Sequence, residues 1–251
     1  DEGGRGSPGP AEAGRGGPGA AEAGGRGGRG GPPTTSMAAG LSRFTWDAQH
    51  EGATTFPGMI LWGATTNGPT ALPGGYQVRL TVDGRAQAQP LTVKKHLFRA
   101  ASDAELKEQF DLAIQIRDKV SEANNAVIQI RRVKQQANDR IAKSSDARLK
   151  EASGWLAKNL SVVEEAIYQV RNRSSQDPLN FPIKINNRIA SLLRVVLTGE
   201  GKPTANAYPI FKDVTAELKV QTDRLQQVLG KYLAAVNVEL KRLGLEPVNE
   251  K

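Results

Sequence analysis

Cysteine is absent from all 251 residues of the chain. Its absence excludes disulfide bonds, thiol catalysis and zinc sites built on thiolates. Long apolar runs are missing as well, because the best candidates, residues 59–62 and 189–197, fall short of the roughly 18 residues that a membrane helix needs. We therefore expect a chain without a membrane span.

The start of the chain lacks the features of a signal peptide. Asp1 is not followed by a basic stretch and then an apolar one. The sequence also opens on aspartate rather than methionine. We expect the chain to be a fragment or a processed piece of a longer protein.

Residues that carry chemistry are few and scattered. The two histidines, His50 and His96, are far apart, and neither has the H-x-x-x-H spacing of a metal site. Asp47, His50 and Glu51 lie close together in "TWDAQHE", but we expect Asp47 on the polar face of a strand and the others in the following loop. No G-x-S-x-G or G-x-x-x-x-G-K-[ST] motif occurs. The sequence predicts a chain without catalytic residues, cofactor or metal.

The net charge of +8 is not concentrated in one segment. Residues 1–36 balance to zero, residues 37–101 carry six basic and three acidic groups, and residues 102–251 carry 24 basic and 19 acidic groups. A nucleic-acid-binding protein more often gathers its basic residues on one face. A mildly basic surface is the favoured interpretation, and nucleic-acid binding is kept as the weaker alternative.

Residues 1–37 are dominated by glycine and arginine, as in "AEAGRGGPGAAEAGGRGGRGGPP". Such a segment has almost no apolar side chain to bury, so it is predicted to be a disordered linker. Arg-Gly repeats also occur in RNA-binding segments. Here acidic residues cancel the arginines, and no aromatic residue lies among them.

Residues 38–100 have the pattern of β-structure. In "GGYQVRLTVDG", Tyr76, Val78, Leu80 and Val82 share one face of a strand. The dipeptide Asp83-Gly84 that follows is typical of a two-residue hairpin turn. The return strand has a poorer pattern, since the simplest register sets glutamines opposite Leu80 and Val78, and a bulge or a longer loop is an alternative. A small Ig-like β-sandwich is predicted for this segment.

Aromatic residues are concentrated in the same segment. We interpret them as the core of the sandwich. The alternative is a sugar-binding face, for which the candidate contacts are Trp46, Phe56, Trp62 and Tyr76.

Residues 101–251 switch to a helical period. Ser102 and Glu105 form a capping box that opens a long helix, whose apolar residues recur about every 3.5 residues up to Ile141. A second helix carries apolar residues from Leu149 to Val170. A third, shorter one ends near Gly199, and a fourth runs from about residue 210 to 243. The prediction is an α+β, multidomain chain that ends in an antiparallel four-helix bundle with two long, coiled-coil-like helices.

Two polar features of the first helix have alternative interpretations. Basic residues near its end are either a solvated tip or a surface for an anionic partner; the candidates are Arg131, Arg132, Lys134 and Arg140. Asn124 and Asn125 lie in mid-helix. If one of them faces the contact between two helices, it specifies the register of the helices. Otherwise both side chains point to solvent.

Four stretches carry a resemblance to a known family: "RFTWD", "FPGMILW", "PGGYQVRLTVDG" and "QFDLAIQIRDKVSEAN". Together with the order of the segments, they resemble the C-terminal region of bacterial sortilin-like, Asp-box β-propeller proteins that are commonly labelled glycosyl hydrolases. The resemblance covers roughly residues 20–248. It implies a propeller upstream, then an Ig-like module, then a helical tail.

The resemblance implies a non-catalytic accessory region that positions or oligomerises the propeller. The Asp-box signature S-x-D-x-G-x-x-W is absent from this sequence, so no catalytic residue is transferred. The implied partners are the upstream propeller and further proteins, or copies of the chain, that bind the long helices. The alternative functions are carbohydrate binding for a glycoside hydrolase and, more weakly, nucleic-acid binding. A periplasmic or extracellular location is implied by the resemblance alone.

Overall fold

The computed structural model describes residues 40, 41, 43–199 and 201–250, so the predicted disordered segment 1–37 lies outside the described residues. The chain divides into two units, Asp1–Trp46 and Asp47–Lys251. The described residues of the first unit form no helix or strand. All of the following elements belong to the second unit.

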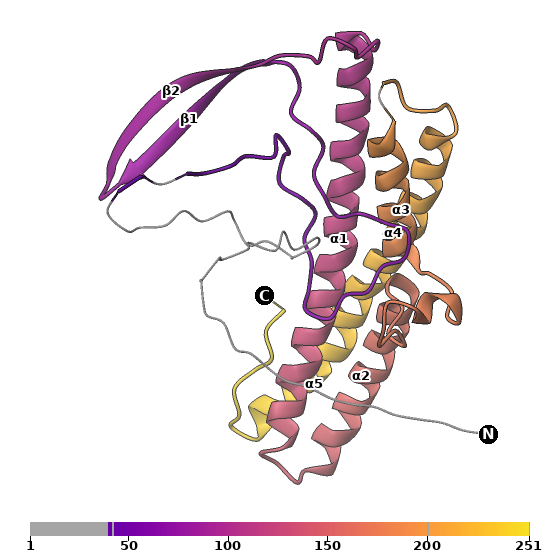
Figure 1. Cartoon of the computed structure of the whole chain (residues 1–251). Helices are drawn as coiled ribbons and strands as arrows, with labels where there is room; N and C mark the ends of the chain where they lie inside the picture. Colours follow the sequence, from indigo (N-terminus) through magenta and orange to yellow (C-terminus); the bar gives the residue numbers. More distant parts are fainter. Residues whose placement is uncertain (1–39, 42, 200, 251) are drawn as a thin grey trace, which may run out of the picture. The chain divides into compact units, whose positions relative to one another are not determined.

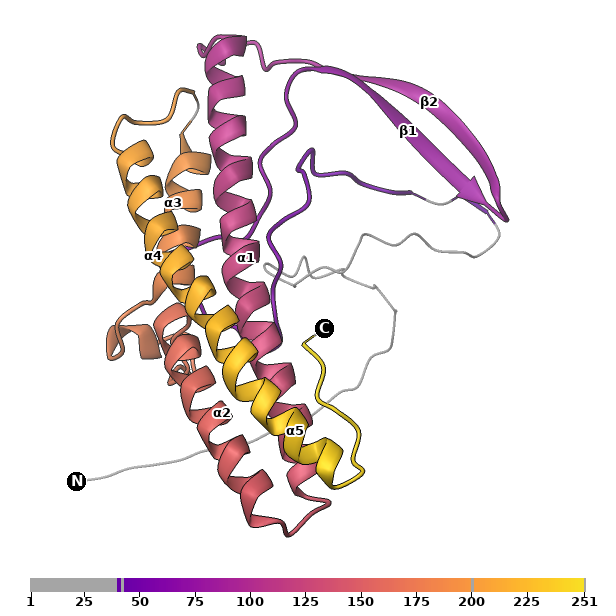
Figure 2. The ribbon, with the colours of Figure 1, turned by 180° about the vertical axis from the view of Figure 1, so that it is seen from behind.

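Four helices pack together in the described part of the chain, and two of them are long (Figure 1). They are α1 (Asp103–Ile141), α2 (Ala147–Ile167), α3 (Ile185–Thr198) and α4 (Ala207–Val228), which continues through a π-helical turn (Leu229–Leu233) into α5 (Ala234–Arg242). A short 3₁₀ turn, Asp177–Leu179, lies between α2 and α3. Figure 2 shows α4 and α5 as one rod that packs over α1 and α2.

Local signals set the ends of these helices. Ser102 accepts a hydrogen bond from the Glu105 N–H, and the Glu105 side chain accepts one from the Ser102 N–H, which confirms the predicted capping box. Asp146 caps α2 with one hydrogen bond, which its side chain accepts from the Leu149 N–H. At the C-terminal end of α5, Gly244 takes a positive φ of 67° directly after the last helical turn.

α2 ends earlier than predicted. The predicted apolar stripe of this helix continues to Val170. The helix stops at Ile167 because Tyr168 turns to an extended conformation. Its buried side chain then lies among the helices, and its hydroxyl accepts a hydrogen bond from the Ile60 N–H at 3.1 Å. A long-range contact therefore overrides the local helical pattern at this point.

The predicted Ig-like sandwich is wrong. Among the described residues the only sheet is a two-stranded antiparallel hairpin of β1 (Gly74–Val82) and β2 (Arg85–Val93). Asp83 and Gly84 form its turn with φ values of 48° and 77°, as predicted. The register follows the two-residue turn without a bulge, so Leu80 lies opposite Gln87 and Val78 opposite Gln89.

Some of the apolar residues expected inside a sandwich lie in the helical core instead. Residues 48–72, which we call the anchor loop, place Ala53, Phe56 and Met59 in the same core as the helices. The two arms of this loop lie close together, and the His50 N–H donates to the Pro69 carbonyl at 2.9 Å. A β-carbon on Gly68 would lie 2.0 Å from the His50 carbonyl oxygen, so this approach requires glycine. No second sheet in the described part of the chain covers the hairpin.

None of the helices among the described residues has both the length and the apolar character that a membrane span needs.

Candidate functional site

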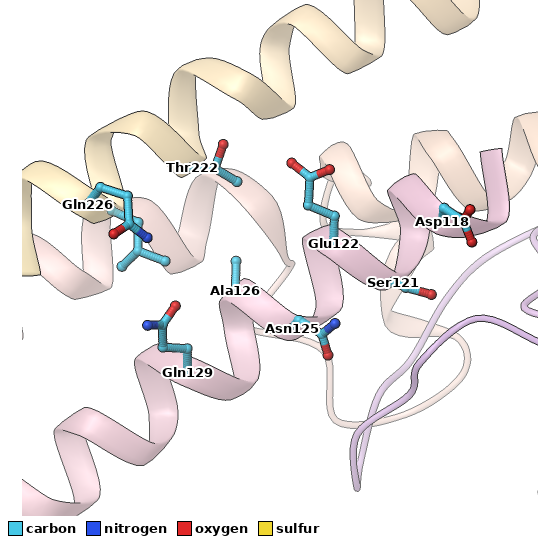
Figure 3. Close-up of a pocket in the computed structure, with 9 residues that line it drawn as sticks. Asp118, Ser121, Glu122, Asn125, Ala126, Gln129, Thr222 and Gln226 are labelled. Carbon is cyan, nitrogen blue, oxygen red and sulfur yellow. The ribbon is translucent and has the colours of Figure 1, made fainter. Parts of the chain in front are cut away.

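An open groove of about 530 Å³ lies between α1 and α4 (Figure 3). Glu122 and Ala126 of α1 face Thr222 and Gln226 of α4 across it. Glu122 is paired with Lys119 at 2.6 Å, and so its carboxylate balances a charge on its own helix. The groove therefore offers amides and carboxylates but no paired nucleophile and base.

Ser121, a possible nucleophile at the groove, has a structural role. Its hydroxyl donates to the Arg117 carbonyl at 3.1 Å and accepts a hydrogen bond from the Thr54 N–H at 3.0 Å. Both of these hydrogen bonds are to backbone groups. Within residues 40–41, 43–199 and 201–250, no group of three or more His, Asp or Glu side chains is placed to hold a metal ion.

A buried polar cluster fastens the anchor loop to the helices. Asn124 of α1 donates to the Thr54 carbonyl at 2.7 Å and accepts from Asn186 of α3 at 3.1 Å. Asn187 accepts from the Trp62 N–H at 2.7 Å and donates to the Trp62 carbonyl at 2.8 Å. Loop backbone groups that would be costly to bury are therefore satisfied by asparagine side chains. These hydrogen bonds tie the anchor loop to α1 and α3.

A second cluster joins α1 to α2 around one buried carboxylate. Glu164 accepts from Arg131 at 2.7 Å and from Lys134 at 2.8 Å. Arg131 also lies over the Phe56 ring, with its guanidinium carbon 4.7 Å from the centroid. Burial by itself raises the pKa of Glu164, but the hydrogen bonds from Lys134 and Arg131 outweigh it and hold the pKa below its ordinary value.

Glu164→Gln is expected to lower the free energy of unfolding by about 1–3 kcal/mol at neutral pH, because two partly buried cations lose their counter-charge. The pKa of Glu164 is lower in the folded chain than in the unfolded chain, so its charge stabilises the fold above about pH 4.5 and this contribution is lost as the pH falls through the folded pKa. Urea unfolding of the wild type and of Glu164→Gln should show that the difference between their free energies of unfolding becomes smaller from pH 7 to pH 3.

Glu165→Gln is the matched control, since Glu165 is the next residue of α2 and is exposed. Its free energy of unfolding should follow the wild-type value at every pH. A difference between wild type and Glu164→Gln that stays constant down to pH 3 would contradict the role assigned to the Glu164 charge.

The four basic residues proposed for an anionic partner all make contacts within the chain. Arg131 and Lys134 bind Glu164, as described above. Arg132 donates to the Glu250 carbonyl at 3.3 Å, and Arg140 donates to the Glu246 carbonyl at 3.1 Å. These arginines thus hold the C-terminal tail along α1. An external anionic partner for them stays a prediction.

The four aromatic residues proposed for sugar binding have different environments. Phe56 is buried, and its ring meets Tyr168 edge to face at 5.0 Å. Trp62 is 41% exposed, and the Tyr76 hydroxyl donates to the Leu72 carbonyl at 2.8 Å. Trp46, the last residue of the first unit, is partly exposed. Phe56 therefore takes no part in a binding face, and sugar binding by the other three stays a prediction.

Sequence reasoning missed one surface. Val78, Leu80 and Val82, which we call the hairpin stripe, are 53%, 59% and 53% exposed on one face of β1. They were expected inside a sandwich core. The signal that pointed to this outcome was the pair of glutamines opposite them, Gln87 and Gln89, because a buried face seldom carries glutamine.

Comparison of the chain with protein-family models, with curated proteins and with solved structures finds no match to any of them. The candidate sites are therefore the features of the chain itself: the groove, the two polar clusters and the hairpin stripe.

Proposed function

We propose that this chain is a non-catalytic interaction region that positions or oligomerises a sortilin-like β-propeller protein. The hairpin stripe is the observation that carries the proposal. A lone two-stranded hairpin is marginally stable in water, and contiguous exposed apolar side chains are typical of a surface that binds another protein. The choice of a sortilin-like parent protein is part of the proposal, and the four stretches that resemble that family support it.

The helices act as the scaffold of this region. Asn124, Asn187 and Tyr168 fix the anchor loop on them, and the anchor loop leads into the hairpin. The 3.5-residue repeat of α1 favours a coiled-coil-like pairing of the long helices in an antiparallel bundle. Residues 1–37 set the distance to the propeller. The resemblance also favours a periplasmic or extracellular location.

The proposal makes a testable prediction about activity and binding. The purified chain should hydrolyse no aryl glycoside, because the groove among the described residues holds no paired nucleophile and base. The reading frame upstream of the codon for Asp1 should encode repeated Asp-boxes, and that upstream segment, expressed separately, should bind the chain in isothermal titration calorimetry.

Leu80→Gln should weaken this binding about tenfold or more, since it places a polar group in an apolar contact. Thr81→Gln is the control, because Thr81 is exposed on the opposite face of β1. Measurable glycoside turnover by the chain, an upstream frame without Asp-boxes, or equal binding by both variants would each contradict the proposal.

A further inference from the structure

The two edges of the hairpin differ in their capacity to accept another strand. In a hairpin with a two-residue turn, the pair that flanks the turn exchanges both hydrogen bonds, and every second pair along the ladder does the same. The flanking pair is Val82 and Arg85. The even-numbered residues of β1 therefore direct their N–H and C=O groups toward β2, and Gly75, Gln77, Arg79 and Thr81 direct theirs away from it.

Among the residues that the structure describes, no further strand pairs with the outer edge of β1, whereas proline blocks the outer edge of β2. Pro90 lies opposite Gln77, at a position of β2 whose backbone points outward, and it has no N–H to donate. A proline at such a position is a common device that prevents further strand pairing. The outward positions of β1 include no proline, and each of them is exposed. The open edge of β1 is thus able to pair along its full length.

The sequence of β1 is complementary to itself. Val78 is the central residue of the nine-residue strand, so an antiparallel pair centred on Val78 aligns all nine residues of both copies. In this register the outward residues meet one another: Gln77 lies opposite Arg79, and Gly75 opposite Thr81. Those are the pairs that hydrogen bonding requires, because both members direct their backbone groups toward the new neighbour.

Side chains favour the same register. On the apolar face, Val78 lies opposite Val78 of the second copy, and Tyr76 lies opposite Leu80. Aromatic–aliphatic and β-branched pairs of this kind stabilise neighbouring strands. A register centred on Arg79 would instead oppose two like charges, and one centred on Gln77 would pair fewer residues. Self-pairing is therefore specified by length, charge and apolar pattern together.

We propose that β1 pairs with β1 of a second copy of this chain and forms a four-stranded antiparallel sheet in the order β2–β1–β1–β2. The two hairpin stripes then lie side by side as one apolar face. This inference rests on the proposed function, since it names the partner through which the region oligomerises. Edge pairing alone buries less surface than a permanent dimer needs, so the dimer is expected to be reversible and concentration-dependent.

Proline substitutions at the two edges test the pairing. Arg79 and Ala88 lie opposite each other, both with outward backbone groups. In sedimentation equilibrium up to millimolar concentration, the wild type and Ala88→Pro should show a monomer–dimer equilibrium. Arg79→Pro should be monomeric, because it removes an N–H from the centre of the new ladder. Circular dichroism should show the same helical content in all three.

A cysteine scan tests the register independently of any effect on folding, since the chain has no cysteine of its own. Val78→Cys should form an intermolecular disulfide under mild oxidation, because the two copies of this position are direct neighbours. Leu80→Cys is the control on the same face with similar exposure. Its two copies would lie four residues apart along the strands, roughly 14 Å, which is too far for a disulfide.

A monomeric wild type at every concentration, or equal cross-linking of Val78→Cys and Leu80→Cys, would overturn the self-pairing. The proposed function is measured separately through binding of the upstream segment to the monomeric Arg79→Pro variant. That binding can persist when the self-pairing fails, and it can fail when the dimer is present, so the two results remain distinguishable.

Discussion

Phe56→Ala is expected to lower the free energy of unfolding by about 3–5 kcal/mol, the usual cost of removing a buried aromatic ring from a packed core. The Phe56 side chain is 5% exposed and lies within the core that the helices share with the anchor loop. Its ring packs edge to face on Tyr168 and beneath the Arg131 guanidinium. Urea unfolding monitored by circular dichroism at 222 nm measures the change, as far-ultraviolet signals follow helical content.

Phe98→Ala is the matched control. Phe98 belongs to the same segment that the sequence assigned to a sandwich, but its side chain is 89% exposed. Surface substitutions of this kind change stability by less than about 0.5 kcal/mol. Comparable losses in the two variants would show that Phe56 does not hold the anchor loop in the core. The helices also retain their own contacts in Phe56→Ala, so the variant should stay folded without denaturant.

Asn124→Ala should lower the free energy of unfolding by about 2–4 kcal/mol, because the truncation removes the partners of one buried and one partly buried polar group. The amide of Asn124 is fully buried. The Thr54 carbonyl loses its donor, and the Asn186 amide loses its acceptor. The same unfolding experiment measures this loss. Hydrogen exchange at Thr54 and its neighbours should also become faster, since the anchor loop opens more readily.

Asn125→Ala provides the comparison within the same helical turn. Asn125 is exposed beside the α1–α4 groove, and alanine has the higher helix propensity, so this variant should equal the wild type or exceed it slightly. Equal stability of the two alanine variants would mean that the buried asparagine cluster contributes nothing net. The pair of variants thus separates the role of burial from that of residue type.

The sequence predicted the helical part of the chain well because its signals are local. The Ser102–Glu105 capping box, the break at residues 142–146 and the Gly199 terminus each act within a few residues, and all of them agree with the structure. The hairpin turn at Asp83 and Gly84 was predicted for the same reason. The turn requires a positive φ at both of its residues, and Asp and Gly adopt this conformation without help from distant residues.

The candidate surfaces were predicted less well. The apolar alternation of β1 was interpreted as one side of a core, but alternation only states that the residues share a face. It does not state that anything covers that face. The basic residues near the end of α1 likewise predict a solvated tip or a binding surface, but Arg131 and Lys134 bind Glu164 of the next helix. Their partner lies some thirty residues away, beyond the reach of any local pattern.

The sequence by itself determined the approximate positions of the helices, the turn of the hairpin and the absence of thiol chemistry. Only the tertiary structure decided that Phe56 joins the helical core, that Asn124 rather than Asn125 is buried, and that the hairpin stripe is exposed. The physical reason is the range of the interactions. Caps, turns and helical period depend on neighbouring residues, whereas the burial of a side chain depends on which distant segments of the chain pack against it.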